Sequence, residues 1–233
     1  MMSCDGSTMR GAETADVDAL YAMINDAYMI EVGDSGVAFK TCSRYQSLPQ
    51  LDAELAAALA DPLSMFTLIA GPTPAVQLSP GSSAAAAAVA NTDPEEKGGD
   101  GAAGASSGTG TLPRGRNGGA ILGCIRARVW TSTAPEDGRR LCEFGPYAVV
   151  PAQQGTGVGA RLLAEVERFG AANGAKVIQI MVVNHRSDVR TYYQRRGFAE
   201  VGEAEFGGNF DLSSLTRPSH FIVMEKGLGL DSA

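Results

Sequence analysis

The feature that most limits how this chain can fold is a stretch of low complexity in its middle. Between Gly71 and Gly119, about thirty residues are glycine, alanine, serine or proline, and side chains large enough to build a core are almost absent. Segments of this composition bury too little apolar surface to offset the conformational entropy that folding removes. We therefore expect a disordered insertion at about 71–119, within a single domain over residues 7–230 that is assembled from the sequence on both sides.

Charge and hydropathy narrow the possible partners of the chain. It has 19 lysines and arginines against 26 aspartates and glutamates, a net charge of −7, which disfavours a nucleic-acid surface and favours cationic partners. The sequence contains no run of about 18 apolar residues, so it predicts no membrane-spanning helix. Residues 1–11 resemble neither a signal peptide nor a transit peptide. We expect a cytoplasmic protein, with an organellar location left open, that is a monomer or a homodimer.

Four scattered cysteines complete the compositional evidence. They form no C-x-x-C pair and are too few to staple a chain of 233 residues. This spacing favours reduced thiols over a structural zinc site or a disulfide framework.

Ahead of the insertion, apolar residues at helical spacing predict two helices, and a short apolar run predicts a strand. Thr14 is the candidate N-cap of the first helix. The predicted elements are helices over residues 16–24 and 50–59 and a strand over residues 65–70.

After the insertion, two strands are followed by a helix and a further strand, which predicts a hairpin and then a βαβ unit. The strand after the helix is apolar throughout, which is typical of a strand buried on both faces. Gly197 is expected to end a short helix. The predicted strands are 120–130, 141–150, 177–183, 198–206 and 221–224, with helices over 158–169 and 189–193. Together these elements predict an α/β fold with a mixed sheet.

The segment over residues 147–163 carries the strongest chemical signal, because a strand leads through a glycine-rich turn into a helix. The first N–H groups of a helix are unsatisfied and lie at the positive end of its dipole, and glycines let an anion approach the backbone. A pyrophosphate would fit this turn. The alternative is that the glycines only allow the helix to pack closely on the sheet.

Two ligand classes are compatible with the turn. Residues 155–160 match the dinucleotide fingerprint G-x-G-x-x-G/A inside a βαβ unit. However, four residues separate the strand from the turn, and the next strand ends in Asn184, His185 and Arg186 instead of the carboxylate that binds a ribose.

The same residues also fit a second pattern, Gln154-x-x-Gly157-x-Gly159, which is followed downstream by Tyr193-Gln194-Arg195-Arg196-Gly197-Phe198. With this pair of motifs, the chain resembles the GNAT superfamily of N-acetyltransferases, most closely over residues 141–201. The resemblance implies a GNAT-like acyl-CoA N-acyltransferase fold, with a mixed, mostly antiparallel (α+β) central sheet and flanking helices. It also implies acetyl-CoA as co-substrate, with no metal.

The resemblance further implies which residues hold the cofactor. Backbone groups of Ala148, Val149 and Val150 would pair with the pantetheine arm as an added strand does, and one N–H would polarise the acetyl carbonyl. Tyr193 would lie beside the sulfur and protonate the departing thiolate. The pyrophosphate would rest on Gln154, Gly155, Thr156, Gly157, Val158, Gly159 and Ala160.

Activation of the amine is a separate problem, because an amine with a pKa near 10.4 is almost entirely protonated at pH 7. Glu143 lies five residues before Ala148. It resembles, in its position, the glutamate that acts as general base in histone-type members of the superfamily. A strand glutamate that faces solvent is the alternative. His220 and His185 are weaker candidates.

One part of the family pattern is altered here. The asparagine usually found seven residues before the tyrosine is Arg186, with Asn184 two residues earlier. Either side chain could contact the cofactor, while Ser187 or Asp188 could cap the following helix. The resemblance places Tyr28 and Glu31 in the wall of the acceptor site.

We therefore predict an acetyl-CoA-dependent N-acetyltransferase that transfers an acetyl group directly to a primary amine in a ternary complex. The acceptor would be a peptide amino group, a lysine, a polyamine or a small-molecule amine such as a metabolite or an antibiotic. Two other classes remain open: a CoA-binding sensor or scaffold without catalysis, and a dinucleotide-dependent redox enzyme.

Overall fold

The computed structural model describes residues 6–28, 45, 47–71, 119–132, 138–206 and 215–229. The predicted insertion lies outside the described residues except at its ends, since Gly71 still belongs to a strand and Gly119 directly precedes the next one. The elements are β1 (Thr8–Gly11), η1 (Thr14–Asp16), α1 (Val17–Tyr28), α2 (Leu48–Ala60), β2 (Ser64–Gly71), β3 (Ala120–Thr131), β4 (Arg140–Val149), η3 (Pro151–Gln153), α3 (Val158–Ala172), β5 (Val177–Val183), α4 (Ser187–Gln194), β6 (Ala199–Ala204) and β7 (Phe221–Gly227).

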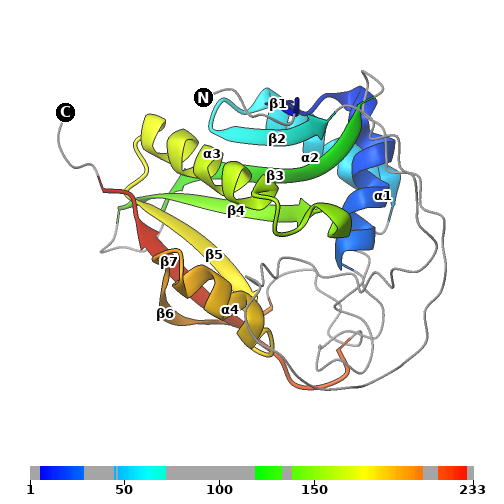
Figure 1. The fold of residues 1–233 in the computed structure, drawn as a ribbon. Helices are drawn as coiled ribbons and strands as arrows, with labels where there is room; N and C mark the ends of the chain where they lie inside the picture. Colours follow the sequence, from blue (N-terminus) through cyan, green and yellow to red (C-terminus); the bar gives the residue numbers. More distant parts are fainter. Residues whose placement is uncertain are drawn as a thin grey trace.

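The strands form one seven-stranded sheet in the order β1-β2-β3-β4-β5-β7-β6 (Figure 1). Among the described pairs, β4 and β5 are parallel and the others are antiparallel. The expected hairpin is the antiparallel pair β3–β4, and the expected βαβ unit is β4–α3–β5. The predicted mixed, mostly antiparallel sheet is confirmed.

The parallel pair is short, and this shapes the centre of the molecule. Strands β4 and β5 pair at three positions, which end with Glu143 opposite Gln179, although β4 continues to Val149. Beyond that point the two strands diverge, and Figure 1 shows β5, β7 and β6 turning away from the first four strands. The diverging strands form a wedge in the sheet between β4 and β5.

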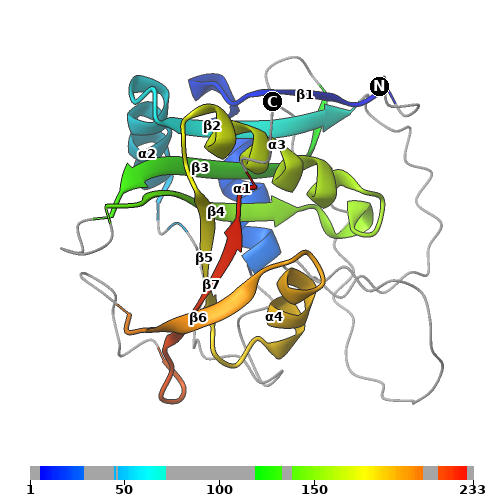
Figure 2. The same ribbon diagram turned by 90° about the vertical axis from the view of Figure 1, so that its left-hand side faces the viewer.

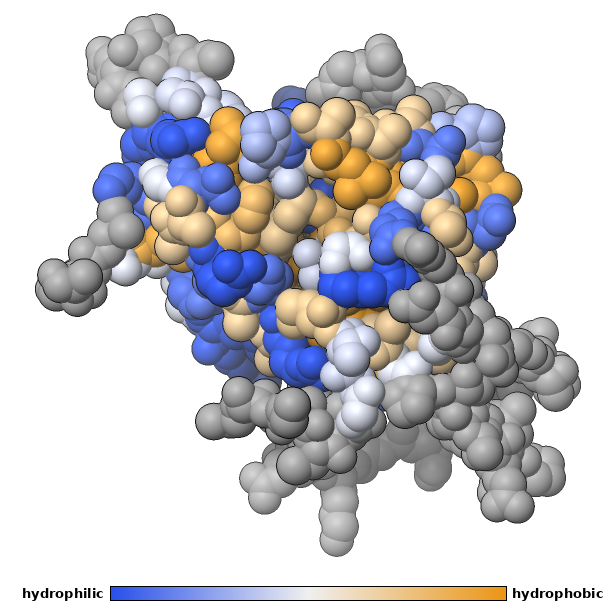
Figure 3. All heavy atoms as spheres, turned by 90° about the horizontal axis from the view of Figure 1, so that it is seen from above, coloured by the Kyte–Doolittle hydropathy of each residue, from blue (hydrophilic) through white to orange (hydrophobic). Residues whose placement is uncertain are grey.

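Helices cover both faces of the first half of the sheet. Helix α3 packs on one face, and α1 and α2 pack on the other (Figures 1 and 2). Gly123 lets α3 come close to β3, because a Cβ there would lie 3.1 Å from Val158 and 3.2 Å from Leu162. Seen from the β1 edge, hydrophobic side chains lie between hydrophilic ones (Figure 3). None of the helices among the described residues is long and apolar enough to cross a membrane.

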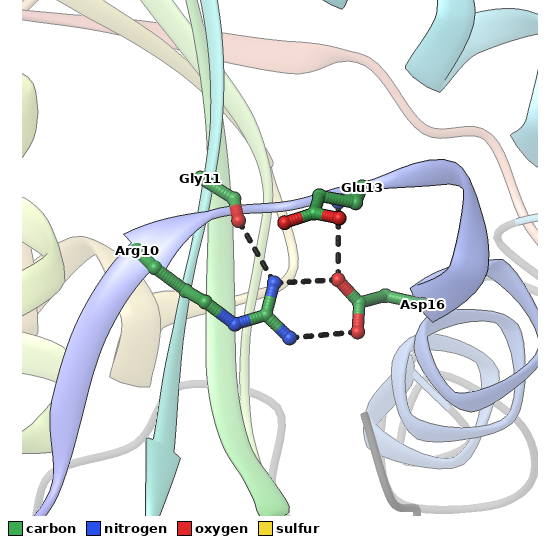
Figure 4. Close-up of polar contacts among 4 residues, drawn as sticks. All are labelled: Arg10, Gly11, Glu13 and Asp16. Carbon is green, nitrogen blue, oxygen red and sulfur yellow. Dashed lines mark hydrogen bonds and ion pairs between the residues drawn. The ribbon is translucent and has the colours of Figure 1, made fainter. Parts of the chain in front are cut away.

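A buried ion pair ties the first strand to the first helix (Figure 4). Two nitrogens of Arg10 donate to the two carboxylate oxygens of Asp16 at 2.7 and 2.8 Å, and Asp16 is fully buried. The Asp16 carboxylate also accepts the N–H of Glu13 at 3.0 Å. The prediction that Thr14 caps the helix is therefore wrong, because Glu13 is the N-cap residue and Asp16 completes a capping box.

Other differences from the prediction concern strand edges. Strand β1 was not predicted, since four residues with no apolar alternation carry little signal. Strand β5 buries Ile178, Ile180 and Val182 on one face, whereas on the other face Val183 is buried and Met181 is 41% exposed. The expectation of burial on both faces therefore fails at Met181.

Candidate active site

The glycine turn between β4 and α3 has the conformation that its sequence predicts. Gly155 and Gly157 have φ angles of 74° and 90°, and Gly157 is the left-handed N-cap residue of α3. A Cβ added at either position would meet nothing within 4 Å. Backbone conformation therefore explains these two glycines, and the open space in front of them would admit an anion to the first N–H groups of α3.

Gly159 has a different explanation. A Cβ at this position would lie 2.5 Å from the hydroxyl oxygen of Tyr147 on β4, closer than any non-bonded contact allows. Close packing of helix on strand thus accounts for this glycine, as the alternative interpretation of the turn proposed. The two interpretations apply to different glycines of the same motif.

On the side of β4 that faces the wedge, the backbone groups beyond Glu143 pair with none of the described strands. The N–H of Val150 donates to the carbonyl of Leu122 on β3 at 2.9 Å, and Ala148 lies opposite Cys124. Because hydrogen-bonding direction alternates along an antiparallel strand, Ala148 and Val150 turn their backbone groups toward β3, while Tyr147 and Val149 turn theirs toward the wedge. Three residues were predicted to pair with a ligand, and of these Val149 turns its backbone groups toward the wedge, whereas Ala148 and Val150 turn theirs toward β3. Tyr147, which also faces the wedge, was not predicted.

Two polar side chains border the start of the turn. Gln154 directs its amide nitrogen toward the carbonyl of Val149 at 3.5 Å, and Thr156 donates to the carbonyl of Gln153 at 2.6 Å. One turn into α3, Arg161 donates to the Ser7 hydroxyl at 2.7 Å, which fixes the start of this helix against the segment before β1. Gln154 therefore lies where the strand edge meets the glycine turn.

Tyr193 on α4 is 2% exposed and lies across the wedge from β4. Its ring contacts Phe144 of β4 at a centroid distance of 5.9 Å. Burial, followed by the phenols of Tyr192 and Tyr28, raises the pKa of Tyr193 well above its ordinary value, and the charges of Arg196 and Arg186 oppose this rise. The phenol is therefore neutral at physiological pH and can donate a hydrogen bond.

The influence of Tyr28 on this pKa also shows where one residue of the predicted acceptor wall lies. Tyr28 is the last residue of α1, so this end of α1 is near Tyr193 although 165 positions separate the two in the chain. Glu31, the other predicted wall residue, lies outside the described residues.

Glu143 occupies the point at which the wedge opens. Its carboxylate lies 3.8 Å from a nitrogen of Arg128 on β3, and its side chain is 31% exposed. In the sheet it lies between Arg128 and Gln179. Glu143 is thus neither a fully solvated glutamate nor a buried one, and its neighbour across the strand pair is basic.

The remaining candidates make contacts within the protein. The ring nitrogen of His220 is 3.6 Å from Glu203, and that of His185 is 3.0 Å from the carbonyl oxygen of Pro218. The side-chain oxygen of Asn184 accepts the backbone N–H of His220 at 3.4 Å. These contacts connect the ends of β5 and β7.

Arg186 is 5% exposed and pairs with Asp188 through two hydrogen bonds of 3.0 and 2.9 Å. Burial acts to raise the pKa of Asp188, but the hydrogen bond and charge of Arg186 outweigh it and hold that pKa below its usual range. Arg186 is itself the N-cap residue of α4 and makes no side-chain capping bond. The charge of Arg186 therefore lies near Tyr193, at the start of the same helix.

Comparison with known proteins agrees with this geometry. The acetyltransferase (GNAT) family model matches residues 91–198, which include β3, β4, the glycine turn and α4. Over these residues the chain is similar to the GNAT acetyltransferases. No curated protein matches the sequence. This similarity supports an acyltransferase that uses acetyl-CoA as its donor, as the sequence motifs predicted.

Solved GNAT structures share the fold at low sequence identity. An N-acetyltransferase from Staphylococcus aureus Mu50 is similar with a TM-score of 0.56 at 16% identity, over 95% of this chain and 98% of that chain. A Salmonella typhimurium protein assigned as an acetyltransferase, solved with its cofactor acetyl-CoA, has a TM-score of 0.56 at 18% identity, over 97% and 96% of the two chains. Spermidine N-acetyltransferase from Vibrio cholerae, solved with CoA and spermine, has a TM-score of 0.56 at 12% identity, over 96% of each chain.

The fold also bears on the dinucleotide interpretation of the glycine turn. That fingerprint belongs to an open, mostly parallel sheet, with the turn directly after its strand. In the described part of this chain the sheet is mostly antiparallel, and η3 separates β4 from the turn. The match to the dinucleotide pattern is therefore one of sequence letters alone.

Proposed function

We propose that the protein is an acetyl-CoA-dependent N-acetyltransferase that holds both substrates at once and transfers the acetyl group directly to a primary amine. One observation carries the proposal: the edge of β4 that faces the wedge leads, through the short η3, to a glycine turn at a helix N-terminus. An extended amide-containing arm can pair with the strand edge while its diphosphate meets the turn.

Backbone groups of the chain itself provide the donor site. The residues from Gln154 to Ala160 hold the pyrophosphate, with Gly155 and Gly157 keeping the approach free of side-chain atoms. Tyr147 and Val149 offer backbone N–H and C=O groups to the pantetheine arm. One of these N–H groups also donates to the acetyl carbonyl oxygen, where negative charge develops during the reaction.

When bound, acetyl-CoA supplies a thioester whose carbon–sulfur bond is replaced by a bond from the same carbon to the amine nitrogen. Tyr193 donates its phenolic hydrogen bond to the sulfur as that bond breaks. Because burial raises the pKa of Tyr193, the phenol stays protonated, and a thiolate with a pKa near 8.5 is stabilised more by this hydrogen bond than by complete proton transfer.

Glu143 is the group that we propose takes the proton from the attacking amine. Its position at the opening of the wedge lets it reach the amine directly or through one water molecule. Arg128 lies 3.8 Å from one carboxylate oxygen of Glu143 and limits the directions in which this side chain can point. The reaction requires no metal.

The acceptor is a primary amine, and the net charge of −7 favours a cationic one, since a negative field increases the encounter rate with cations. Peptide amino groups, lysine side chains, polyamines and small-molecule amines all satisfy this condition. The similarity to a spermidine acetyltransferase solved with spermine makes polyamines the first acceptors to assay.

Thermal unfolding with acetyl-CoA and, in parallel, with NAD tests the donor site. A ligand at about 100 times its dissociation constant should stabilise the protein by about 2.7 kcal/mol. We expect a shift with acetyl-CoA and none with NAD, and the opposite result would overturn the proposal. Initial rates with an amine panel then test turnover, and binding of acetyl-CoA without turnover of any amine would favour the sensor or scaffold alternative.

Tyr193→Phe is the matched variant for the chemical step. It should lower kcat about tenfold or more while acetyl-CoA affinity stays within a few-fold, because only the hydroxyl is removed. An unchanged kcat would remove Tyr193 from the mechanism.

A further inference from the structure

Two tyrosine hydroxyls meet in the core beside the wedge. The hydroxyl oxygen of Tyr147 on β4 is 3.0 Å from that of Tyr192 on α4, and the bond is buried. The two residues are 3% and 4% exposed. Buried tyrosine hydroxyls normally find a partner, and here each provides one for the other.

This bond crosses the wedge where the sheet itself does not. Backbone pairing between β4 and β5 ends at Glu143 and Gln179, so α4, which follows β5, is attached to β4 through side chains. The ring contacts of Phe144 with Tyr193 and Phe198 are apolar and weakly directional. The hydroxyl pair, by contrast, fixes both a distance and a direction.

Both ends of the pair are held in place. The guanidinium of Arg196 lies 3.6 Å from the ring centroid of Tyr192 and donates to the carbonyl of the same residue at 3.1 Å. At the other end, the Tyr147 hydroxyl is pressed against the first turn of α3, since it is the atom that a Cβ at Gly159 would meet. The hydroxyl oxygen of Tyr147 on β4 therefore contacts both α4, through Tyr192, and the first turn of α3, at Gly159.

We propose that the hydroxyl pair of Tyr147 and Tyr192 is a positioning device that sets Tyr193 relative to the wedge-facing edge of β4 and the glycine turn. Tyr192 and Tyr193 are neighbours on α4, about 100° apart around its axis, so fixing one fixes the rotation and height of the other. The inference rests on the proposed function, because it uses the role of Tyr193.

The Tyr147 hydroxyl of the pair is protected from ionisation by its surroundings. Burial, together with the neighbouring phenols of Tyr192 and Tyr193, raises the pKa of Tyr147 well above its ordinary value. The Tyr147 hydroxyl is therefore not lost by ionisation near neutral pH.

The test uses phenylalanine variants, which remove one oxygen each and keep the ring. Tyr147→Phe and Tyr192→Phe should each lower kcat about tenfold with KM for acetyl-CoA nearly unchanged, well within the 10²-fold that a displacement of about 1 Å can cost. In a Tyr193→Phe background, adding Tyr147→Phe should cause no further loss of kcat, because the pair acts through Tyr193.

Hydrogen exchange provides a readout that needs no turnover. In both single variants, amides of α4 should exchange about fivefold faster, as expected for one lost hydrogen bond, while amides of α3 and β5 keep their rates. Unchanged hydrogen exchange in α4 would overturn the proposal. An equal fold-loss of kcat from Tyr147→Phe in the wild-type and in the Tyr193→Phe background would overturn it as well. If Tyr193→Phe alone keeps full activity, the proposed role of Tyr193 fails, and the exchange rates still decide whether the pair holds α4.

Discussion

Replacing Gly159 with alanine tests the contact on which several of these arguments depend. In the family pattern this position takes either glycine or alanine, and alanine is the better helix former by about 0.5–1 kcal/mol. Propensity and family pattern alone therefore predict that Gly159→Ala is neutral or stabilising. The packing predicts the opposite.

The magnitude follows from three distances. The new Cβ would lie 2.5 Å from the Tyr147 hydroxyl oxygen, 3.4 Å from the carbon that bears it and 3.6 Å from Val149. Moving the hydroxyl away stretches its 3.0 Å bond to Tyr192. Overpacking costs about 1–3 kcal/mol and a buried hydroxyl without a partner about 1–3 kcal/mol, so after the gain in propensity the net destabilisation is about 3 kcal/mol.

Denaturant unfolding of four proteins measures this effect: wild type, Gly159→Ala, Tyr147→Phe and the double variant. Removing the Tyr147 hydroxyl leaves the new Cβ at ordinary contact distances, so alanine at position 159 should cost less than about 1 kcal/mol in that background. For a chain of this size, 3 kcal/mol corresponds to a fall in Tm of about 6–12 °C. A Gly159→Ala protein as stable as wild type would refute the close approach of β4 and α3.

Three further predictions concern ionisable groups. Glu143→Gln should lower kcat about 10²-fold at neutral pH and less at pH 10, where the amine deprotonates unaided, and a pH–rate profile identical to wild type would exclude a base at this position. Arg10→Met leaves the buried carboxylate of Asp16 without its charge partner and should lower the free energy of unfolding in urea by about 3 kcal/mol, whereas a loss below 1 kcal/mol would contradict this. The lowered pKa of Asp188 contributes stability above about pH 4 that is lost as pH falls through the folded-state pKa, so the stability gap between wild type and Asp188→Asn should narrow below pH 4 and stay constant from pH 5 to 8.

Residue periodicity predicted most helices and strands of this fold, since apolar residues at fixed spacing determine which face of an element is buried. It missed β1, which is held by pairing with β2 and by the buried pair of Arg10 and Asp16. Both of these contacts are tertiary. The half-exposed Met181 shows the reverse case, in which an apolar run predicted burial on both faces but the fold leaves one of its side chains exposed.

The candidate site shows the same division. Glycines at positions 155 and 157 could be predicted because local backbone conformation requires them. The wedge could not, since it depends on where pairing between β4 and β5 stops. The backbone direction of Tyr147 depends likewise on the register between β3 and β4. One signal of the hydroxyl pair was present in the residue types: Tyr147 and Tyr192 lie in a predicted strand and a predicted helix, and a tyrosine hydroxyl that becomes buried needs a partner.

The pairing of β2 with β3 has a consequence for engineering. Gly71 pairs with Ala120, so the two ends of the long connection leave the sheet from directly opposed residues, about 5 Å apart. Closing a longer loop between fixed ends costs only about 0.6 kcal/mol per doubling of its length. A foreign domain with adjacent termini could therefore replace the connection without changing the strand register. Because Gly123 lies opposite Val149, such a domain would emerge beside the glycine turn, where a ligand-dependent reporter could sense occupation of the donor site.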